Sequence, residues 1–288
     1  MKGIQDLPAE LFLEIFCLAD LKTLISCRGV CSYWRELVLR AHIPSARKKL
    51  LRLYLKLLQS PVFYHTRSYI LPNLQTFDRE LYISRLPAST PDEFKTWILE
   101  WPAKAVIGWL WPGLSAKPPV DPPEFSLIKR GTNLLPPTTH GGPMISEATF
   151  LNPESGKYDL IYFPMMGAMG WRSSVWSEIG LDALDVSMLP IRRMPADYTF
   201  VRYSVKLAVG AGKGGDRVVG GMHRVGYCMT DCMGFSWVDY LEQELIFEEN
   251  DLAESRPPAR LTVIQTPPSP SDMVFLGTPQ RARAHVLA

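Results

Sequence analysis

The 288-residue sequence has few cysteines, almost no net charge and no long apolar run. Five cysteines are an odd number, so a disulfide framework is not expected and a reducing compartment fits better. A net charge of +2 gives no large field for nucleic acid or an anionic membrane. No apolar run reaches the roughly 18–20 residues that cross a bilayer. We therefore expect neither a nucleic acid nor a membrane as partner.

The N-terminus also lacks the features of a secretory signal. Its apolar stretch from Ile4 to Leu18 is interrupted by Asp6, Glu10 and Glu14, which a signal peptide would not carry. Nor does the chain contain an internal repeat or a Gly-x-Ser-x-Gly elbow, so repeat folds and α/β-hydrolases are not expected.

Prolines, in contrast, are plentiful, and their clusters mark boundaries. The sequence has 25 of them, and five lie within residues 112–124, which predicts a Pro-rich loop. After Glu254 prolines recur while apolar residues lose any period, so we expect residues 255–288 to be a disordered tail.

Residues 4–42 predict three short helices. Asp6 is the expected N-cap of the first and Asp20 of the second, and Gly29 is expected to end the second. The first helix carries apolar residues at helical spacing. This line consists of Leu7, Leu11, Ile15 and Leu18. Val30 and Trp34 begin a similar line in the third helix.

Residues 44–60 predict a connecting helix with one apolar face. The opposite face carries a run of basic residues, which we interpret as a solvated helix surface because the whole chain is nearly neutral.

Residues 61–254 predict a mixed α+β domain. Helices are expected from Pro91 to Trp101 and over 235–247, whereas 105–111 fits a buried strand or a helix end. Strands are expected at 148–151, 158–163, 174–176, 200–207 and 225–229. The first two of these strands are expected to form a hairpin. A flexible connection is expected at 210–216. The acidic stretch 242–254 is expected to be solvated. The predicted fold class is thus α+β, with a helical N-terminus and a disordered tail.

The first forty residues resemble the F-box family. The family's opening appears as Leu7-Pro8-x-Glu10-Leu11, and its Ile-aromatic step as Ile15-Phe16 followed by Leu18. Its second-helix aliphatic pair appears as Leu24-Ile25, and its Val-Cys-x-x-Trp signature as Val30-Cys31-Ser32-Tyr33-Trp34. Ala19, Leu21 and Cys27 depart from the usual pattern at three positions.

This resemblance implies both a partner and a role. F-box proteins dock onto a Skp-type adaptor, which bridges to a cullin and a RING subunit, while the rest of the chain presents a target for ubiquitin transfer. The expected function is therefore substrate recruitment in an SCF ubiquitin ligase, without catalysis, cofactor or metal, in the cytoplasm or nucleus. The expected adaptor-binding residues are Leu7, Pro8, Leu11, Ile15, Leu18, Leu24, Val30 and Trp34. The expected domains are an F-box at 1–43, the helix at 44–60 and a substrate-recognition domain at 61–254.

A physical argument supports the same interpretation. Forty residues are near the lower limit of independent folding, yet this segment carries more large apolar side chains than three short helices can cover. The remainder need another surface, either elsewhere in the chain or on a partner.

Two other classes of function stay open from the sequence. One is a scaffold that binds the adaptor without a cullin. The other is an enzyme with a site near His223 and Cys228, where a histidine and a thiol could act together. The same residues with Cys232 could ligate a metal, but no further cluster completes four ligands. A weaker similarity in element order, ending in Ser236-Trp237-Val238-Asp239-Tyr240-Leu241, relates the second domain to the Smi/Knr-type (SUKH) α+β domains.

Overall fold

The computed structural model divides the chain into two compact units, and each is described separately. The first unit comprises Met1–Pro44 with Pro258–Ala288, and the second comprises Ser45–Pro257. The residues that the structure describes are 7–118, 131–139, 141–151, 159–162, 183–194, 204–211, 218–225 and 230–255. The expected disordered tail at 255–288 lies, apart from Ser255, outside these residues.

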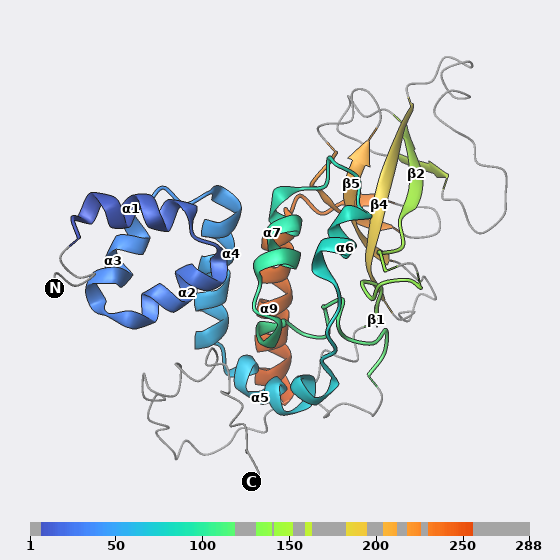
Figure 1. The fold of residues 1–288 in the computed structure, drawn as a ribbon. Helices are drawn as coiled ribbons and strands as arrows, with labels where there is room; N and C mark the ends of the chain where they lie inside the picture. The colour runs from blue at the N-terminus through green and yellow to red at the C-terminus, as the bar shows by residue number, and fades with distance from the viewer. Residues whose placement is uncertain are drawn as a thin grey trace, which may run out of the picture. The chain divides into compact units, whose positions relative to one another are not determined.

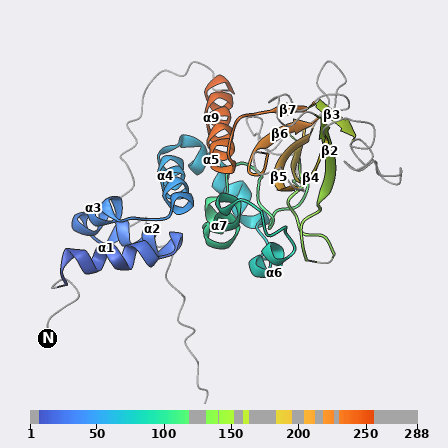
Figure 2. The ribbon, with the colours of Figure 1, turned by 90° about the horizontal axis from the view of Figure 1, so that it is seen from above.

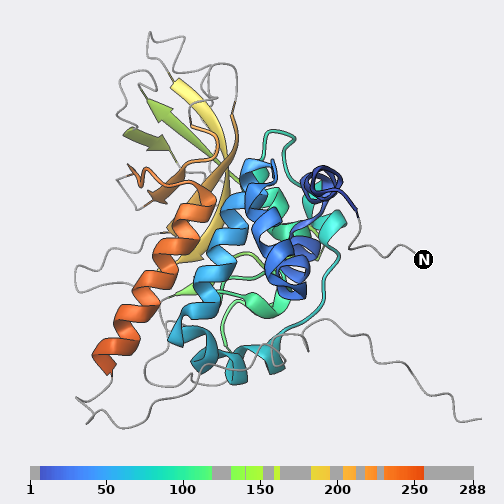
Figure 3. The same cartoon turned by 90° about the vertical axis from the view of Figure 1, so that its left-hand side faces the viewer.

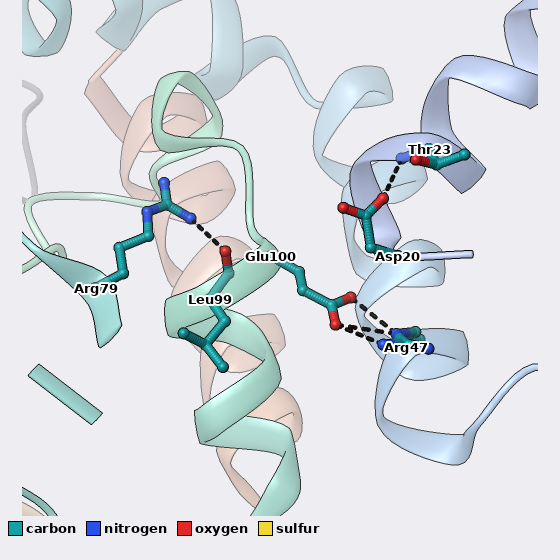
Figure 4. A network of polar contacts seen from close by, with 6 residues as sticks. All are labelled: Asp20, Thr23, Arg47, Arg79, Leu99 and Glu100. Atoms are coloured by element: carbon teal, nitrogen blue, oxygen red, sulfur yellow. Dashed lines mark hydrogen bonds and ion pairs between the residues drawn. The ribbon is translucent and has the colours of Figure 1, made fainter. Parts of the chain in front are cut away.

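In the described residues of the first unit the chain forms three helices, as expected (Figure 1): α1 (Ala9–Leu18), α2 (Leu21–Val30) and α3 (Ser32–Arg40). Helix α1 begins after Pro8, whose carbonyl accepts hydrogen bonds from the amides of Leu11 and Phe12. The predicted N-cap Asp6 is therefore wrong, because the helix starts later. Asp20 does cap α2, accepting a hydrogen bond from the Thr23 amide at 2.8 Å (Figure 4).

Gly29 does not end α2, contrary to expectation. The helix continues to Val30, and Cys31 takes an extended conformation that separates α2 from α3. A glycine weakens a helix without forbidding it, so flanking residues decide where the helix stops.

The second unit begins with a run of helices on its N-terminal side and closes with a long one. They are α4 (Ser45–Gln59), α5 (Pro61–Ile70), the 3₁₀ turn η2 (Leu71–Asn73), α6 (Arg79–Ser84), α7 (Asp92–Glu100), the 3₁₀ turn η3 (Ala103–Ala105) and α9 (Trp237–Ser255). The helices predicted at 44–60 and from Pro91 to Trp101 are confirmed as α4 and α7. The closing helix extends eight residues beyond the predicted end at 247.

A seven-stranded antiparallel sheet forms the other layer of the second unit. Its order is β3-β2-β4-β5-β6-β7, and β1 pairs with β4. The strands are β1 (Thr132–Asn133), β2 (Ser146–Leu151), β3 (Asp159–Tyr162), β4 (Ala183–Arg193), β5 (Ser204–Ala211), β6 (Met222–Val225) and β7 (Thr230–Cys232). Figures 1 and 2 show α4, α7 and α9 on one side of this sheet. The fold class α+β is confirmed.

The strand predictions have mixed outcomes. The hairpin of β2 and β3 is confirmed, and β5 matches part of the predicted strand at 200–207. Of the predicted strand at 225–229, only Val225, the last residue of β6, lies within the described residues. The central strand β4 was not predicted. Residues 174–176 and most of the connection 210–216 lie outside the described part of the chain.

Segment 105–111 forms no strand, and only Ala105, the last residue of η3, belongs to a helix. Residues 106–111 are irregular chain whose large side chains are buried, including Ile107, Trp109 and Trp111. Gly108 adopts φ of +56°, and a Cβ there would lie 2.6 Å from Oε1 of Glu248. The left-handed backbone and the nearby Glu248 carboxylate together favour glycine at this position, because a side chain would not fit. The described part of the Pro-rich loop, residues 112–118, has no helix or strand.

Tryptophans form the centre of the second unit. The Trp97 ring lies 4.8 Å from that of Trp111 and 4.9 Å from that of Trp237, measured between centroids. Phe94 adds an edge contact to Trp237 at 5.1 Å. Edge-to-face packing of this kind stabilises aromatic cores beyond their buried area.

The basic run of α4 is not simply a solvated face. Arg47 forms a bidentate pair with Glu100 of α7, Lys49 contacts Glu93 of α7 at 2.5 Å, and Lys56 contacts Glu242 of α9 at 2.7 Å. Figure 4 shows the Arg47–Glu100 pair, and Figure 3 shows α4 running beside α9. Three of the basic side chains therefore link α4 to other helices of the second unit.

The acidic stretch is likewise only partly solvated, which corrects the expectation. Glu244 and Glu248 are buried on α9, and Arg192 of β4 donates to Glu244 at 2.5 Å. Burial alone would lower the pKa of Arg192, but Glu244, Tyr240 and Glu248 hold it above its ordinary value. A buried charged network thus joins the sheet to the closing helix.

Candidate functional site

Helix α1 is apolar on two opposite sides. Phe12 and Phe16 are each 1% exposed and pack against Trp34 of α3, with ring centroids 5.2 and 5.7 Å apart. The opposite side carries Leu11, Ile15 and Leu18, the last residue being 82% exposed, and Leu7 lies just before the helix. We call these four residues the outer stripe. The three helices therefore fold around the aromatic side and leave the aliphatic side uncovered.

The outer stripe follows from the geometry of the helix. Residues four apart lie one above another, so positions 11 and 15 follow one line on α1, and 18 lies beside it. Leu11 is 44% and Ile15 49% exposed, which is unusual for aliphatic side chains aligned in one row. Glu10 and Glu14, both exposed, lie on the same helix. Such a row with charges beside it is typical of a protein-binding surface.

Two further predicted residues lie near helix ends and are accessible. Pro8 is exposed immediately before α1. Val30 is 62% exposed at the end of α2, next to Cys31, whose sulfur accepts a hydrogen bond from the Trp34 amide at 3.5 Å. This cap fixes the start of α3 directly after Val30.

Leu24 and Trp34 are placed differently. Leu24 is fully buried, and Trp34 is half-buried because its ring packs on Phe12 and Phe16. Leu24 therefore presents no surface to a partner, and we expect it to act by supporting the helices. Of the eight predicted binding residues, six are exposed: Leu7, Pro8, Leu11, Ile15, Leu18 and Val30.

The structure also exposes apolar residues that the sequence did not single out. Tyr33 is 47% and Leu39 62% exposed on α3. Both lie close in sequence to residues of the buried face of α3, so the sequence pattern alone did not indicate that these two side chains are exposed. Tyr33 contacts Phe12 edge-on at 6.4 Å between ring centroids, which ties it to the α1 side of the unit.

Positive charge gathers at the end of α2. The Arg35 side chain donates to the carbonyl of Arg28 at 3.3 Å, which brings the two guanidinium groups together. Burial, and then the charge of Arg35, lower the pKa of Arg28. Within the part of the chain that the structure describes, no group pairs with Nε or Nη1 of Arg28.

Of the alternative site near His223 and Cys228, the structure describes His223 alone. His223 lies on β6, is 1% exposed, and burial lowers its pKa to about 4, so the imidazole is neutral at pH 7. Cys228 lies outside the described residues. Among those residues, no group of three or more His, Cys, Asp or Glu could hold a metal ion. The predicted His–Cys pair therefore stays a prediction.

None of the helices in the described ranges has the length and apolar character needed to span a bilayer.

A family model described as F-box-like matches residues 4–43. No curated protein and no solved structure matches the chain. The N-terminal segment is therefore an F-box-like domain, as its resemblance indicated, and domains of this kind generally bind Skp-type adaptors. The similarity of the second unit to SUKH domains stays a prediction.

Proposed function

We propose that this chain is the substrate-recruiting subunit of an SCF-type ubiquitin ligase. In this role the F-box-like domain binds a Skp-type adaptor, which connects to a cullin and a RING subunit. The chain performs no ubiquitin chemistry itself, and its contribution is to hold a target near the transfer site. The proposed location, which follows from this role, is the cytoplasm or the nucleus.

The observation that carries the proposal is the outer stripe. Its four aliphatic residues are between 36% and 82% exposed, and three of them lie in one row on a single helix. Exposed rows of this kind are unfavourable in water unless a partner covers them. Each fully buried aliphatic side chain contributes about 1.5–3 kcal/mol, so the row suffices to anchor a stable interface.

The test is co-purification of the adaptor with variants of the outer stripe. Leu11→Asp combined with Leu18→Asp places two charges on the stripe without disturbing Phe12 or Phe16. The matched control is Leu39→Asp, because Leu39 is also an exposed leucine of the first unit but was not predicted to bind. We expect the double variant to lose the adaptor and the control to retain it.

Two further measurements make the result decisive. Hydrogen exchange of the α1–α3 amides should be unchanged in the double variant, which excludes unfolding as the cause. Retention of stoichiometric adaptor by a folded double variant would contradict the proposed site. Leu24→Asp is unsuitable here, since charging a buried leucine would unfold the domain.

The same purification separates the ligase from a scaffold. A ligase subunit brings the cullin and the RING subunit along with the adaptor, whereas a scaffold brings the adaptor alone. Proteins that remain bound to the double variant are candidates for the recruited target. We propose that such targets bind the second unit, which is the larger part of the described chain.

A further inference from the structure

Two basic side chains of α4 take no part in the ion pairs that link this helix to α7 and α9. They are Lys48 and Arg52, and both are exposed. Arg47, Lys49 and Lys56 are each paired with a glutamate. Among the described residues, the charged groups of Lys48 and Arg52 have no such partner. The exposed face of α4 therefore carries positive charge that this part of the chain does not neutralise.

A serine begins the same row on α4. Ser45 is the first residue of the helix, and it is exposed. Residues three and four apart are neighbours on a helix surface, so Ser45 lies beside Lys48, and Lys48 lies beside Arg52. The first turn of α4 contains no acidic residue. An accessible hydroxyl group therefore lies at the end of a row of two unpaired cations.

This arrangement suits a phosphate group attached to the serine. A phosphoserine carries a charge of about −1.5 to −2 at neutral pH and three strong acceptor oxygens. On Ser45 these oxygens would lie next to the Lys48 ammonium group, which forms strong charge-assisted hydrogen bonds with phosphate. The phosphate would also lie at the start of a helix, where negative charge is favourable.

We propose that Ser45 is a phosphorylation site and that Lys48 pairs with the phosphate. A protein kinase transfers the group from ATP. The bond between Ser45 Oγ and the γ-phosphorus forms as the bond to the bridging oxygen breaks, ADP leaves, and the hydroxyl proton passes to a base of the kinase. Three basic residues follow the serine at 47–49, a charge pattern that suits a kinase with an acidic substrate groove. Helix ends open at little cost, so the kinase can reach the first turn.

The proposed site lies directly after the F-box-like segment, which ends at residue 43. Phosphorylation is expected to stabilise the first turn of the helix that follows this segment. The inference does not rest on adaptor binding, because Ser45 and Lys48 belong to the second unit and the outer stripe belongs to the first.

The modification is tested on the full chain purified from its native cells in the presence of phosphatase inhibitors. Trypsin cleaves after Arg40 and Arg47, so residues 41–47 form one peptide in which Ser45 is the only hydroxyl-bearing residue. We expect mass spectrometry to find this peptide with one phosphate attached. Finding the peptide only in its unmodified form would overturn the assignment of the site.

The role of Lys48 is tested on the full chain with phosphoserine incorporated at position 45 during translation. The measurement is hydrogen exchange at the Lys49 and Leu50 amides, since their helical hydrogen bonds close the first turn of α4. We expect exchange about fivefold slower than in the unmodified chain. Lys48→Gln should remove most of this slowing. Unchanged exchange on phosphorylation, or equal slowing with and without Lys48, would overturn the proposed pairing.

The matched control is phosphoserine at Ser84, an exposed serine at the last position of α6. There the same group lies at the carboxyl end of a helix, where negative charge is unfavourable. Exchange of the α6 amides should therefore not slow. Equal protection of α4 and α6 by the phosphate would show that the position of the serine and its neighbouring lysine do not matter.

Discussion

In the first unit, aliphatic side chains of α1 are exposed, whereas in the second unit arginine, lysine, histidine and glutamate side chains are buried. Leu18 is 82% exposed, while Arg192 is 3% exposed and its Nη1 lies 2.5 Å from Glu244. The first arrangement is unfavourable without a partner, and the second is tolerable only with every charge compensated. The comparison indicates that the exposed aliphatic side chains of the first unit need a partner to cover them, whereas the buried charges of the second unit are compensated by other residues of the same unit.

The largest effect on stability should come from breaking the buried ion pair between Arg192 and Glu244. Arg192→Leu leaves the carboxylate of Glu244 buried without its cation, and we expect a loss of about 3–5 kcal/mol in the free energy of unfolding of the second unit. Urea unfolding followed by tryptophan fluorescence measures this, since seven of the eight tryptophans lie in the second unit.

The control for that experiment is an ion pair at the surface of the same unit. Lys56 and Glu242 are 2.7 Å apart, but their side chains are 38% and 43% exposed. Lys56→Leu should therefore change stability by less than about 1 kcal/mol. Equal losses for the two variants would show that burial does not distinguish the pairs.

The second prediction compares the two sides of α1. Phe16→Ala removes a ring that packs on Trp34, and we expect the first unit to lose about 3 kcal/mol, seen as faster hydrogen exchange of the α1–α3 amides. Leu18→Ala should leave exchange unchanged while weakening adaptor binding. If Leu18→Ala accelerated exchange as much as Phe16→Ala, the outer stripe would belong to the core.

The third prediction concerns pH. Lys206 has a pKa of about 7 in the folded protein, well below its ordinary value, so the unfolded chain holds a proton that the folded chain lacks at higher pH. Stability should therefore rise between about pH 7 and 9.5, by roughly 3 kcal/mol, and be constant below that range with respect to this group. Urea unfolding at pH 6.5, 8 and 9.5 measures the rise.

Lys206→Met provides the necessary comparison, because other groups also titrate in this range. The variant should be more stable than the unsubstituted chain at pH 6.5, and this advantage should shrink toward pH 9.5. Identical pH dependence in both proteins would mean that the buried amine keeps its ordinary pKa.

Periodic segments could be predicted well from the sequence, and long-range pairings could not. Helix α4 matches its prediction because its apolar face and its boundaries are both local features. Strand β4 was missed because Pro190 and the adjacent Arg192 and Arg193 argue against a central strand. The structure accommodates them with a register shift between Pro190 and Arg192, which turns Arg192 toward Glu244 on a helix 52 residues later.

For the candidate binding surface, too, local features could be predicted from the sequence and long-range packing could not. The residues of the outer stripe could be named from spacing and family resemblance, but spacing cannot tell which apolar side of α1 faces inward. That choice depends on Trp34, which packs against Phe12 and Phe16. For the same reason Leu24 was included among the binding residues, although the structure buries it.

The smallest effect is expected at Gly29, within α2 and next to the exposed Val30. A Cβ at this position would meet no atom within 4 Å, so Gly29→Ala removes the flexibility of glycine without creating a clash. We expect a gain of about 0.5–1 kcal/mol in the stability of the first unit, measured by hydrogen exchange of α2. Adaptor binding should be unchanged, since the methyl group adds little to the surface. A stabilised domain that lost the adaptor would show that the partner needs α2 to open at this glycine, and the first unit would then be completed by a conformational change instead of by docking onto a preformed surface.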